Sequence, residues 1–338
     1  MGFESLPGSF LPACAAVTGL AASLQRVTAG FAGYLARRFA LLLFTLVLVP
    51  SLSFCFFQLL EQDIPGPAEM FKELVDYLGA TFLHADLGSG NFQNQTFIRT
   101  RSAFSVVSDG FLVDVALLGG ALVAGVLIGL AAGAVQAVWP RSVASRVVAV
   151  VTAFMLSSPV YWLGLLVLLF FAPGIGSAAQ IPFLSTVGGY RSPGDDPVAF
   201  VQALWLPCLI IAAPLAAACT RMAAGQLGGT LHEDFVRTAR GKGLRRGRIV
   251  RHHAMPVASA PVIALIAVNM NLIITNTALV ETVFNIPGGF RYMERALVNR
   301  DIDLVQALIL EATFFIVVAN FVADAAIAWL DPRVRESM

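Results

Sequence analysis

Long runs of apolar residues, broken by short polar segments, dominate the hydrophobic pattern of the chain. A helix needs about 20 apolar residues to cross the hydrocarbon core of a bilayer, because each residue advances it by about 1.5 Å. Six runs meet or approach this length, near residues 39–60, 111–138, 147–172, 200–220, 257–281 and 307–330. They are continuously apolar, whereas the strands of a membrane barrel alternate between apolar and polar positions. The pattern therefore predicts an all-α fold with six transmembrane helices.

The composition agrees with residence in a membrane. Of the 338 residues, 57% are hydrophobic and only 13% are charged, whereas about a quarter of a soluble domain is charged. We expect one transmembrane domain over residues 37–336, preceded by a cytoplasmic extension over residues 1–36. The extension contains an apolar stretch without a basic segment before it, which is not typical of a cleaved signal peptide.

The distribution of Lys and Arg predicts the orientation, because short cytoplasmic loops retain these residues. Basic residues gather before the first run, between the second and third, between the fourth and fifth, and after the sixth. Both termini are therefore expected in the cytoplasm. The segments 61–110, 173–199 and 282–306 would then be external, and we expect the first to form a small ordered loop. The formal net charge of +1 gives no indication of a nucleic-acid partner.

The most informative loop is the basic segment Arg221–Met255. Thr230 and Glu233 have the spacing of a capping box, which predicts a helix start at this point. Phe235 and Ala239 then lie four residues apart on one face, with Val236 beside them. The pattern predicts a helix over 231–243 that ends at Gly241 and Gly243, followed by a second basic helix that leads into the fifth run.

Two functions are compatible with this segment. A basic cytoplasmic loop can simply enforce topology and attract anionic lipid headgroups of the bilayer. A helix with an apolar stripe can instead bind in a groove of a partner protein. Lipid attraction requires neither a capping box nor an apolar face around Phe235, so the helical pattern favours docking.

The same segment resembles a known family. The sequence from Phe235 to Leu244, followed by the His252–Pro256 stretch, resembles the EAA loop of binding-protein-dependent ABC importers of the dipeptide/oligopeptide/nickel branch. Ala239 and Gly243 match the Ala and Gly of that motif, and Pro256 follows at the same spacing. Other matching signatures are Asp86-Leu87-Gly88, Glu281-Thr282-Val283-Phe284 with Pro287-Gly288, Asn299-Arg300-Asp301 and Asp331-Pro332-Arg333.

The resemblance implies a type I importer permease in the cell membrane of a bacterium or archaeon, with both termini in the cytoplasm. It also implies a second homologous permease subunit, two ABC ATPase subunits and an extracytoplasmic solute-binding protein as partners. ATP and magnesium would bind to the ATPase subunits, and no cofactor or metal is expected on this chain. The residues expected to couple to the ATPases are Glu233, Phe235, Thr238, Ala239, Arg240, Gly243, Leu244 and Pro256.

Polar residues within the apolar runs form a second group of candidates. Asn269 and Asn276 are seven residues apart and therefore share a helix face. They either make hydrogen bonds between helices or line a solute passage. Asp324 is expected to contact a neighbouring helix, and Glu311 is expected to be hydrated near the outer boundary. The membrane carboxylates show no pattern typical of a proton relay.

The sequence contains no catalytic motif. His252 and His253 are adjacent, so their side chains diverge on a helix, and no phosphate-binding loop or metalloprotease motif occurs. Together with the resemblance, this implies a transport subunit that imports peptides or similar small solutes, with ATP hydrolysis on separate subunits. The alternatives are an ion-coupled secondary transporter and a membrane scaffold that recruits a soluble partner through its basic loop.

Overall fold

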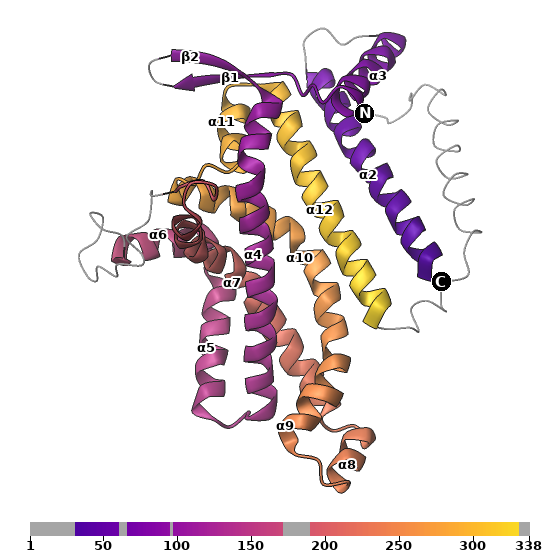
Figure 1. Ribbon diagram of the computed structural model, residues 1–338, viewed down its shortest axis with the longest axis vertical. Coiled ribbons are helices and arrows are strands. Elements are labelled where there is room, and N and C mark those ends of the chain that lie inside the picture. Colours follow the sequence, from indigo (N-terminus) through magenta and orange to yellow (C-terminus); the bar gives the residue numbers. More distant parts are fainter. Residues whose placement is uncertain (1–30, 61–65, 95–96, 172–189, 331–338) are drawn as a thin grey trace, which may run out of the picture.

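The chain folds into a bundle of long helices with a small projection at each end (Figure 1). The computed structural model describes residues 31–60, 66–94, 97–171 and 190–330. The long helices are α2 (Phe31–Leu60), α4 (Ala103–Val138), α7 (Pro197–Thr230), α10 (Met255–Phe284) and α12 (Ile302–Leu330). The shorter elements are α3 (Pro67–Leu83), β1 (Ser89–Asn94), β2 (Phe97–Ser102), α5 (Val143–Ser157), α6 (Val160–Phe171), α8 (Asp234–Gly241), α9 (Arg246–Ile249), a π-helical turn (Val250–Ala254), a 3₁₀ turn (Phe290–Tyr292) and α11 (Met293–Val298).

The helical architecture is confirmed, and five of the six apolar runs lie within one long helix each. Four of the described helices are long and apolar enough to cross a bilayer, and the number reaches six if each of two bent helix pairs forms one crossing. The third run is not the single helix that we predicted. It divides into α5 and α6, whose axes differ by 111°. Ser158 between them is extended, with φ −95° and ψ 130°, because Pro159 disfavours helical geometry in the residue before it.

The first segment predicted to be external has more structure than a loop. It contains α3 and an antiparallel hairpin in which Ser89 pairs with Ser102 and Asn94 with Phe97. The hairpin is a small departure from the all-α prediction. α3 lies against α2, where the Tyr77 ring stacks on Phe54 with ring centroids 4.9 Å apart.

Close contact between α4 and α7 forms the centre of the bundle. Glycines at positions 125, 129 and 133 share one face of α4 and are buried. A β-carbon at Gly129 would lie 2.3 Å from Cys219 Cβ and 2.9 Å from the Ala216 carbonyl oxygen, both on α7. Small residues at this spacing allow two helix backbones to approach closely. α5, α6 and α10 pack against this pair, and α12 packs against both α2 and α10.

Candidate functional site

The segment predicted to couple to partners forms a separate projection at one end of the bundle. Figure 1 shows α8 and α9 at the bottom of the view, beyond the ends of α7 and α10, with the hairpin and α11 at the opposite end. The segment is basic, with Arg or Lys at positions 237, 240, 242, 245, 246, 248 and 251. We call residues 231–254 the α8 segment.

The predicted capping box is not present. Thr230 is the last residue of α7, and its hydroxyl donates to the Gln226 carbonyl 2.8 Å away. Glu233 is instead the N-cap residue of α8, extended at φ −66° and ψ 152°, and its side chain makes no capping hydrogen bond. The first third of the predicted loop, Arg221–Thr230, therefore continues α7, and the separate helix starts three residues later than predicted.

The turn after α8 is confirmed. α8 ends at Gly241, and Gly243 adopts a left-handed conformation with φ +79°. Its amide donates to the Arg240 carbonyl at 2.9 Å, and the Leu244 amide donates to the Ala239 carbonyl at 3.3 Å. A glycine fits this position because other residues rarely adopt positive φ. The chain then returns through α9 and the π-helical turn into α10.

A compact apolar cluster attaches the α8 segment to the bundle. Val236 and Ile249 are almost completely buried, at 0% and 1% exposure. They pack with residues from the ends of α4, α7 and α10, and we call this group the α8 cluster: Val138, Leu227, Leu231, Val236, Ile249, Ala254 and Ala258. Ala239 and Leu244 are partly buried against it. Since one apolar core joins α8 to three long helices, a force on α8 would be transmitted to them.

The predicted docking residues therefore divide into two groups. Ala239 and Leu244 help attach α8 to the bundle, whereas Phe235 is 45% exposed although it is a large apolar side chain. The other predicted residues have exposed side chains or backbone, namely Glu233, Thr238, Arg240, Gly243 and Pro256. The Arg240 guanidinium also donates to the Leu231 carbonyl at 3.4 Å, beyond the end of α7. A cation is favourable at this position because helix C-terminal carbonyls carry partial negative charge.

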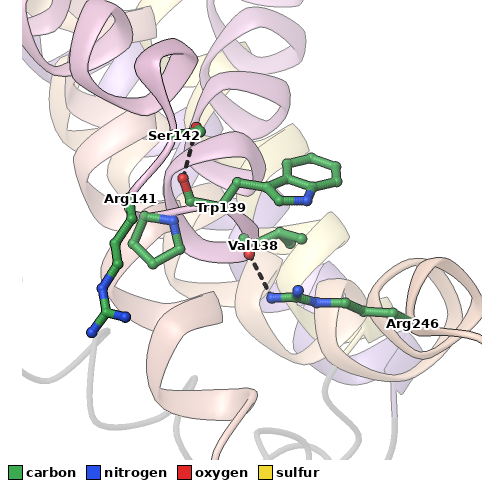
Figure 2. A pocket seen from close by; sticks show the side chains of 6 residues that line it. Val138, Trp139, Arg141, Ser142 and Arg246 are labelled. Atoms are coloured by element: carbon green, nitrogen blue, oxygen red, sulfur yellow. Dashed lines mark hydrogen bonds between the residues drawn. The ribbon is translucent and has the colours of Figure 1, made fainter.

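A shallow hollow beside the α8 segment was not predicted from the sequence (Figure 2). It lies between the α4–α5 connection and α9 and is lined by Val138, Trp139, Pro140, Arg141, Ser142 and Arg246. Arg246 donates a hydrogen bond to the Val138 carbonyl at the end of α4. Trp139 is 56% exposed. The residues that line the hollow come from two segments far apart in the sequence, so neither segment alone indicates it.

The polar residues of α10 lie mainly toward the bundle. Asn276 is buried, and Asn269 is partly buried with its amide donating to the Leu265 carbonyl at 2.8 Å. The exposed side chains of this part of α10 include Val268, Leu272 and Leu279. Burial of the asparagines is compatible with hydrogen bonding between helices, and their lining of a solute passage stays a prediction.

The acidic residues of the long helices differ in their surroundings. Asp324 is confirmed in contact with a neighbouring helix, because its carboxylate lies 3.2 Å from the Arg38 guanidinium of α2. Glu311, which we expected to be hydrated, is only 4% exposed, so that prediction was wrong. It lies on α12, next to the Gly289 backbone and the Asp114 carboxyl of α4.

These features define a class of protein. Apolar helices long enough to cross a bilayer, with a basic helical segment packed against their ends, are the features of a multi-pass membrane protein. The family model for the binding-protein-dependent transport system inner membrane component matches residues 125–336, and the chain belongs to this family.

Named relatives agree with this membership. The chain is 27% identical over 317 residues to the probable peptide ABC transporter permease protein y4tP of Sinorhizobium fredii, a match that covers 89% of this chain and 99% of the relative. It is equally similar to the glutathione transport system permease protein GsiC of Escherichia coli K12, with 89% and 98% covered. The chain is therefore a transport subunit of the ABC importer permease family rather than a secondary transporter, a scaffold or an enzyme.

Proposed function

We propose that this chain pairs with a second homologous permease subunit and that two ABC ATPase subunits bind the α8 segments of the pair. The observation that carries the proposal is the contrast within α8, where Val236 is fixed in the α8 cluster while Phe235 is exposed. A partly exposed aromatic ring on a short helix is a typical anchor for a groove in a partner. ATP and magnesium would bind to the ATPase subunits.

The α8 cluster supports a lever mechanism. When the ATPases close on ATP, α8 would move as a rigid element and carry the ends of α4, α7 and α10 with it. The solute passage would then open alternately to the two sides, because each state is favoured by contacts that exist only in that state. Asn269 and Asn276 are the residues of α10 that we propose for the passage.

The proposed orientation of the chain in the membrane places both termini and α8 on the cytoplasmic side. In Figure 1 the start of α2 and the end of α12 point toward the end of the bundle that carries α8. Six crossings with both termini in the cytoplasm would place α8 beside cytoplasmic ATPases. Two of these six crossings would be bent: one formed by α5 and α6 together, and one formed by α10. The membrane would be the cell membrane of a bacterium or archaeon.

The solute class is proposed from the relatives. Their names specify peptide transport and glutathione transport, and glutathione is itself a small peptide. We propose that a solute-binding protein delivers peptides or similar small solutes to the end of the bundle that carries the hairpin and α11.

The test of ATPase docking uses the assembled transporter in proteoliposomes. Phe235→Asp should reduce copurification of the ATPases and solute-stimulated ATP hydrolysis by at least tenfold, because it places a charge in an apolar groove. Gly243→Pro should have a similar effect, since proline cannot adopt the positive φ of this turn. Both variants should still insert into the membrane.

Val298→Asp is the matched control, because Val298 is 77% exposed on α11 at the opposite end of the bundle. It introduces the same charge and should retain the ATPases. Normal ATPase retention by Phe235→Asp and Gly243→Pro, or labelling of a cysteine at position 232 from outside the cell, would contradict the proposal.

A further inference from the structure

Three acidic side chains from three different helices meet inside the bundle. Asp114 of α4 and Glu281 of α10 are 0% exposed, and Glu311 of α12 is 4% exposed. They surround the turn at Pro287–Gly289 that follows α10. The Gly289 amide donates to Asp114 Oδ2 at 2.9 Å, and the Arg291 amide donates to Glu281 Oε2 at 2.8 Å. We call Asp114, Glu281 and Glu311 the carboxyl cluster.

The turn passes so close to these carboxyl groups that only glycine fits. A β-carbon at Gly288 would lie 2.3 Å from Glu281 Oε1 and 2.5 Å from Asp114 Oδ1. One at Gly289 would lie 2.7 Å from Glu311 Oε2. Carboxyl groups and backbone are therefore packed against each other without space for a larger residue.

Four oxygens of the cluster have no hydrogen-bond donor if all three groups are treated as ionised acceptors: Asp114 Oδ1, Glu281 Oε1 and both oxygens of Glu311. The Asp114 carboxyl nevertheless lies in side-chain hydrogen-bonding contact with both Glu281 and Glu311. Two carboxylates cannot make a hydrogen bond, because neither carries a donor. Each of these contacts therefore requires a proton.

Among the residues that the structure describes, no ion pair compensates for the charge. The ion pairs Arg38–Asp324 and Arg237–Asp234 involve none of the three carboxyl groups. The Arg291 guanidinium is engaged with the Ile286 carbonyl at 3.1 Å and with the Tyr292 ring, 5.0 Å from its centroid. Within the described part of the chain, no group of acidic, His or Cys residues has an arrangement that could hold a metal ion. Three adjacent buried carboxylates would repel one another strongly.

We propose that the carboxyl cluster is a proton-binding site that holds two protons at neutral pH and fastens α4, α10 and α12 to the Pro287–Gly289 turn. One proton belongs to Glu281 and one to Glu311, and each is donated to the Asp114 carboxylate. Asp114 also accepts from the Gly289 amide, so the single negative charge lies on the group with the most donors. The three carboxyl groups and two protons carry a net charge of −1.

The proposal has a measurable consequence for stability. The unfolded chain would release both protons at neutral pH, since free carboxyl groups ionise near pH 4. Folding that retains protons becomes less favourable as the pH rises. The unfolding equilibrium constant should therefore increase up to about tenfold per pH unit for each retained proton. Loss of the protons would separate the carboxyl groups and release the turn.

Infrared spectroscopy of the purified full-length chain in lipid nanodiscs tests the protonation directly. At neutral pH we expect a carbonyl stretching band of buried protonated carboxyl groups, which shifts on exchange into D₂O and disappears at strongly alkaline pH. Glu281→Gln with Glu311→Gln should remove the band. Glu294→Gln, which changes an exposed carboxylate of α11, should leave it unchanged. Absence of the band from the wild-type chain at neutral pH, or its persistence in the double variant, would overturn the proposal.

Thermal unfolding of the same samples gives an independent test. The wild-type midpoint should fall between mildly acidic and alkaline pH, and the double amide variant should lose much of this dependence while it keeps the fold. If the variant does not fold, the wild-type band and its disappearance at alkaline pH still decide the question. A wild-type midpoint that responds to sodium or calcium but not to pH would show a metal cation in place of protons. The site needs no partner subunit, so its test is independent of ATPase docking.

Discussion

Phe235 and Val236 are adjacent on α8 and have opposite surroundings: the Val236 side chain is completely buried, whereas Phe235 is 45% exposed. The buried residue joins α8 to the bundle through the α8 cluster. The exposed one is available to a partner. Attachment and docking therefore depend on different residues and can be separated by mutation.

Val236→Asp should detach α8 from the bundle without unfolding the rest of the chain. Burial of a valine side chain stabilises by about 1.5–3 kcal/mol, and an unpaired buried charge adds a further cost. Hydrogen exchange measured by mass spectrometry should show faster exchange over residues 234–241 in this variant. Phe235→Asp should leave the exchange of α8 unchanged, although it weakens ATPase binding. Equal exchange rates in both variants would show that the α8 cluster does not hold the helix.

Gly129→Ala should destabilise the packing of α4 on α7. Its β-carbon would meet Cys219 Cβ at 2.3 Å and a backbone carbonyl at 2.9 Å, so the helices would have to separate. Overpacking of this kind costs about 1–3 kcal/mol. Gly119→Ala is the matched control on the same helix, because a β-carbon there meets nothing within 4 Å and should be neutral or slightly stabilising. Unfolding in mixed micelles titrated with SDS measures both variants, and similar curves would contradict the prediction.

The length of the apolar runs was sufficient to predict the helices, because crossing a bilayer imposes a minimum length that the sequence shows directly. Break points were harder to predict. The run over 147–172 is apolar on both sides of Ser158, so its hydropathy hides a bend that Pro159 imposes. Proline alone is not decisive, since Pro207 and Pro214 lie within the continuous helix α7.

The candidate site was predicted in part, for a similar reason. Local chemistry indicated the glycine turn, because it depends on neighbouring residues. The predicted apolar face of Phe235, Ala239 and Val236 is divided, because Val236 and Ala239 pack against the bundle while Phe235 is exposed. The start of α8 was misplaced, because Thr230 continues α7 by bonding back to Gln226 instead of capping the next helix. Asp114, Glu281 and Glu311 come from three helices far apart in the sequence, and their contact depends on how those helices pack. No local pattern could have indicated the carboxyl cluster.

Gly243→Ala should weaken coupling without preventing assembly. The position has open space around it but a φ of +79°, so the cost is conformational and not steric. A left-handed conformation costs a non-glycine residue about 1–2 kcal/mol. Gly241→Ala is the matched control, because Gly241 is helical and also has open space. We expect lower solute-stimulated ATP hydrolysis per transporter for Gly243→Ala than for Gly241→Ala, and Gly243→Asn should be intermediate, since asparagine tolerates this conformation better.

The ion pair between Arg38 and Asp324 should contribute modestly to the attachment of α2 to α12. The two groups are 3.2 Å apart, and their side chains are 36% and 23% exposed. Such partly exposed pairs typically have coupling energies of about 0.2–1 kcal/mol. The Phe39 and Phe321 rings, 6.1 Å apart, also join these helices, so loss of the ion pair alone should not release α2.

A charge exchange isolates this contribution. Arg38→Asp places two acids together, and Asp324→Arg places two basic groups together, so each single variant should be destabilised. The double variant should recover part of the loss, and the non-additive part measures the coupling energy. Arg37→Asp combined with Asp324→Arg is the matched control, because Arg37 has no ion pair among the described residues. Additive effects in both double variants would mean that the helices are held by apolar packing and that Arg38 serves another role, such as contact with lipid headgroups.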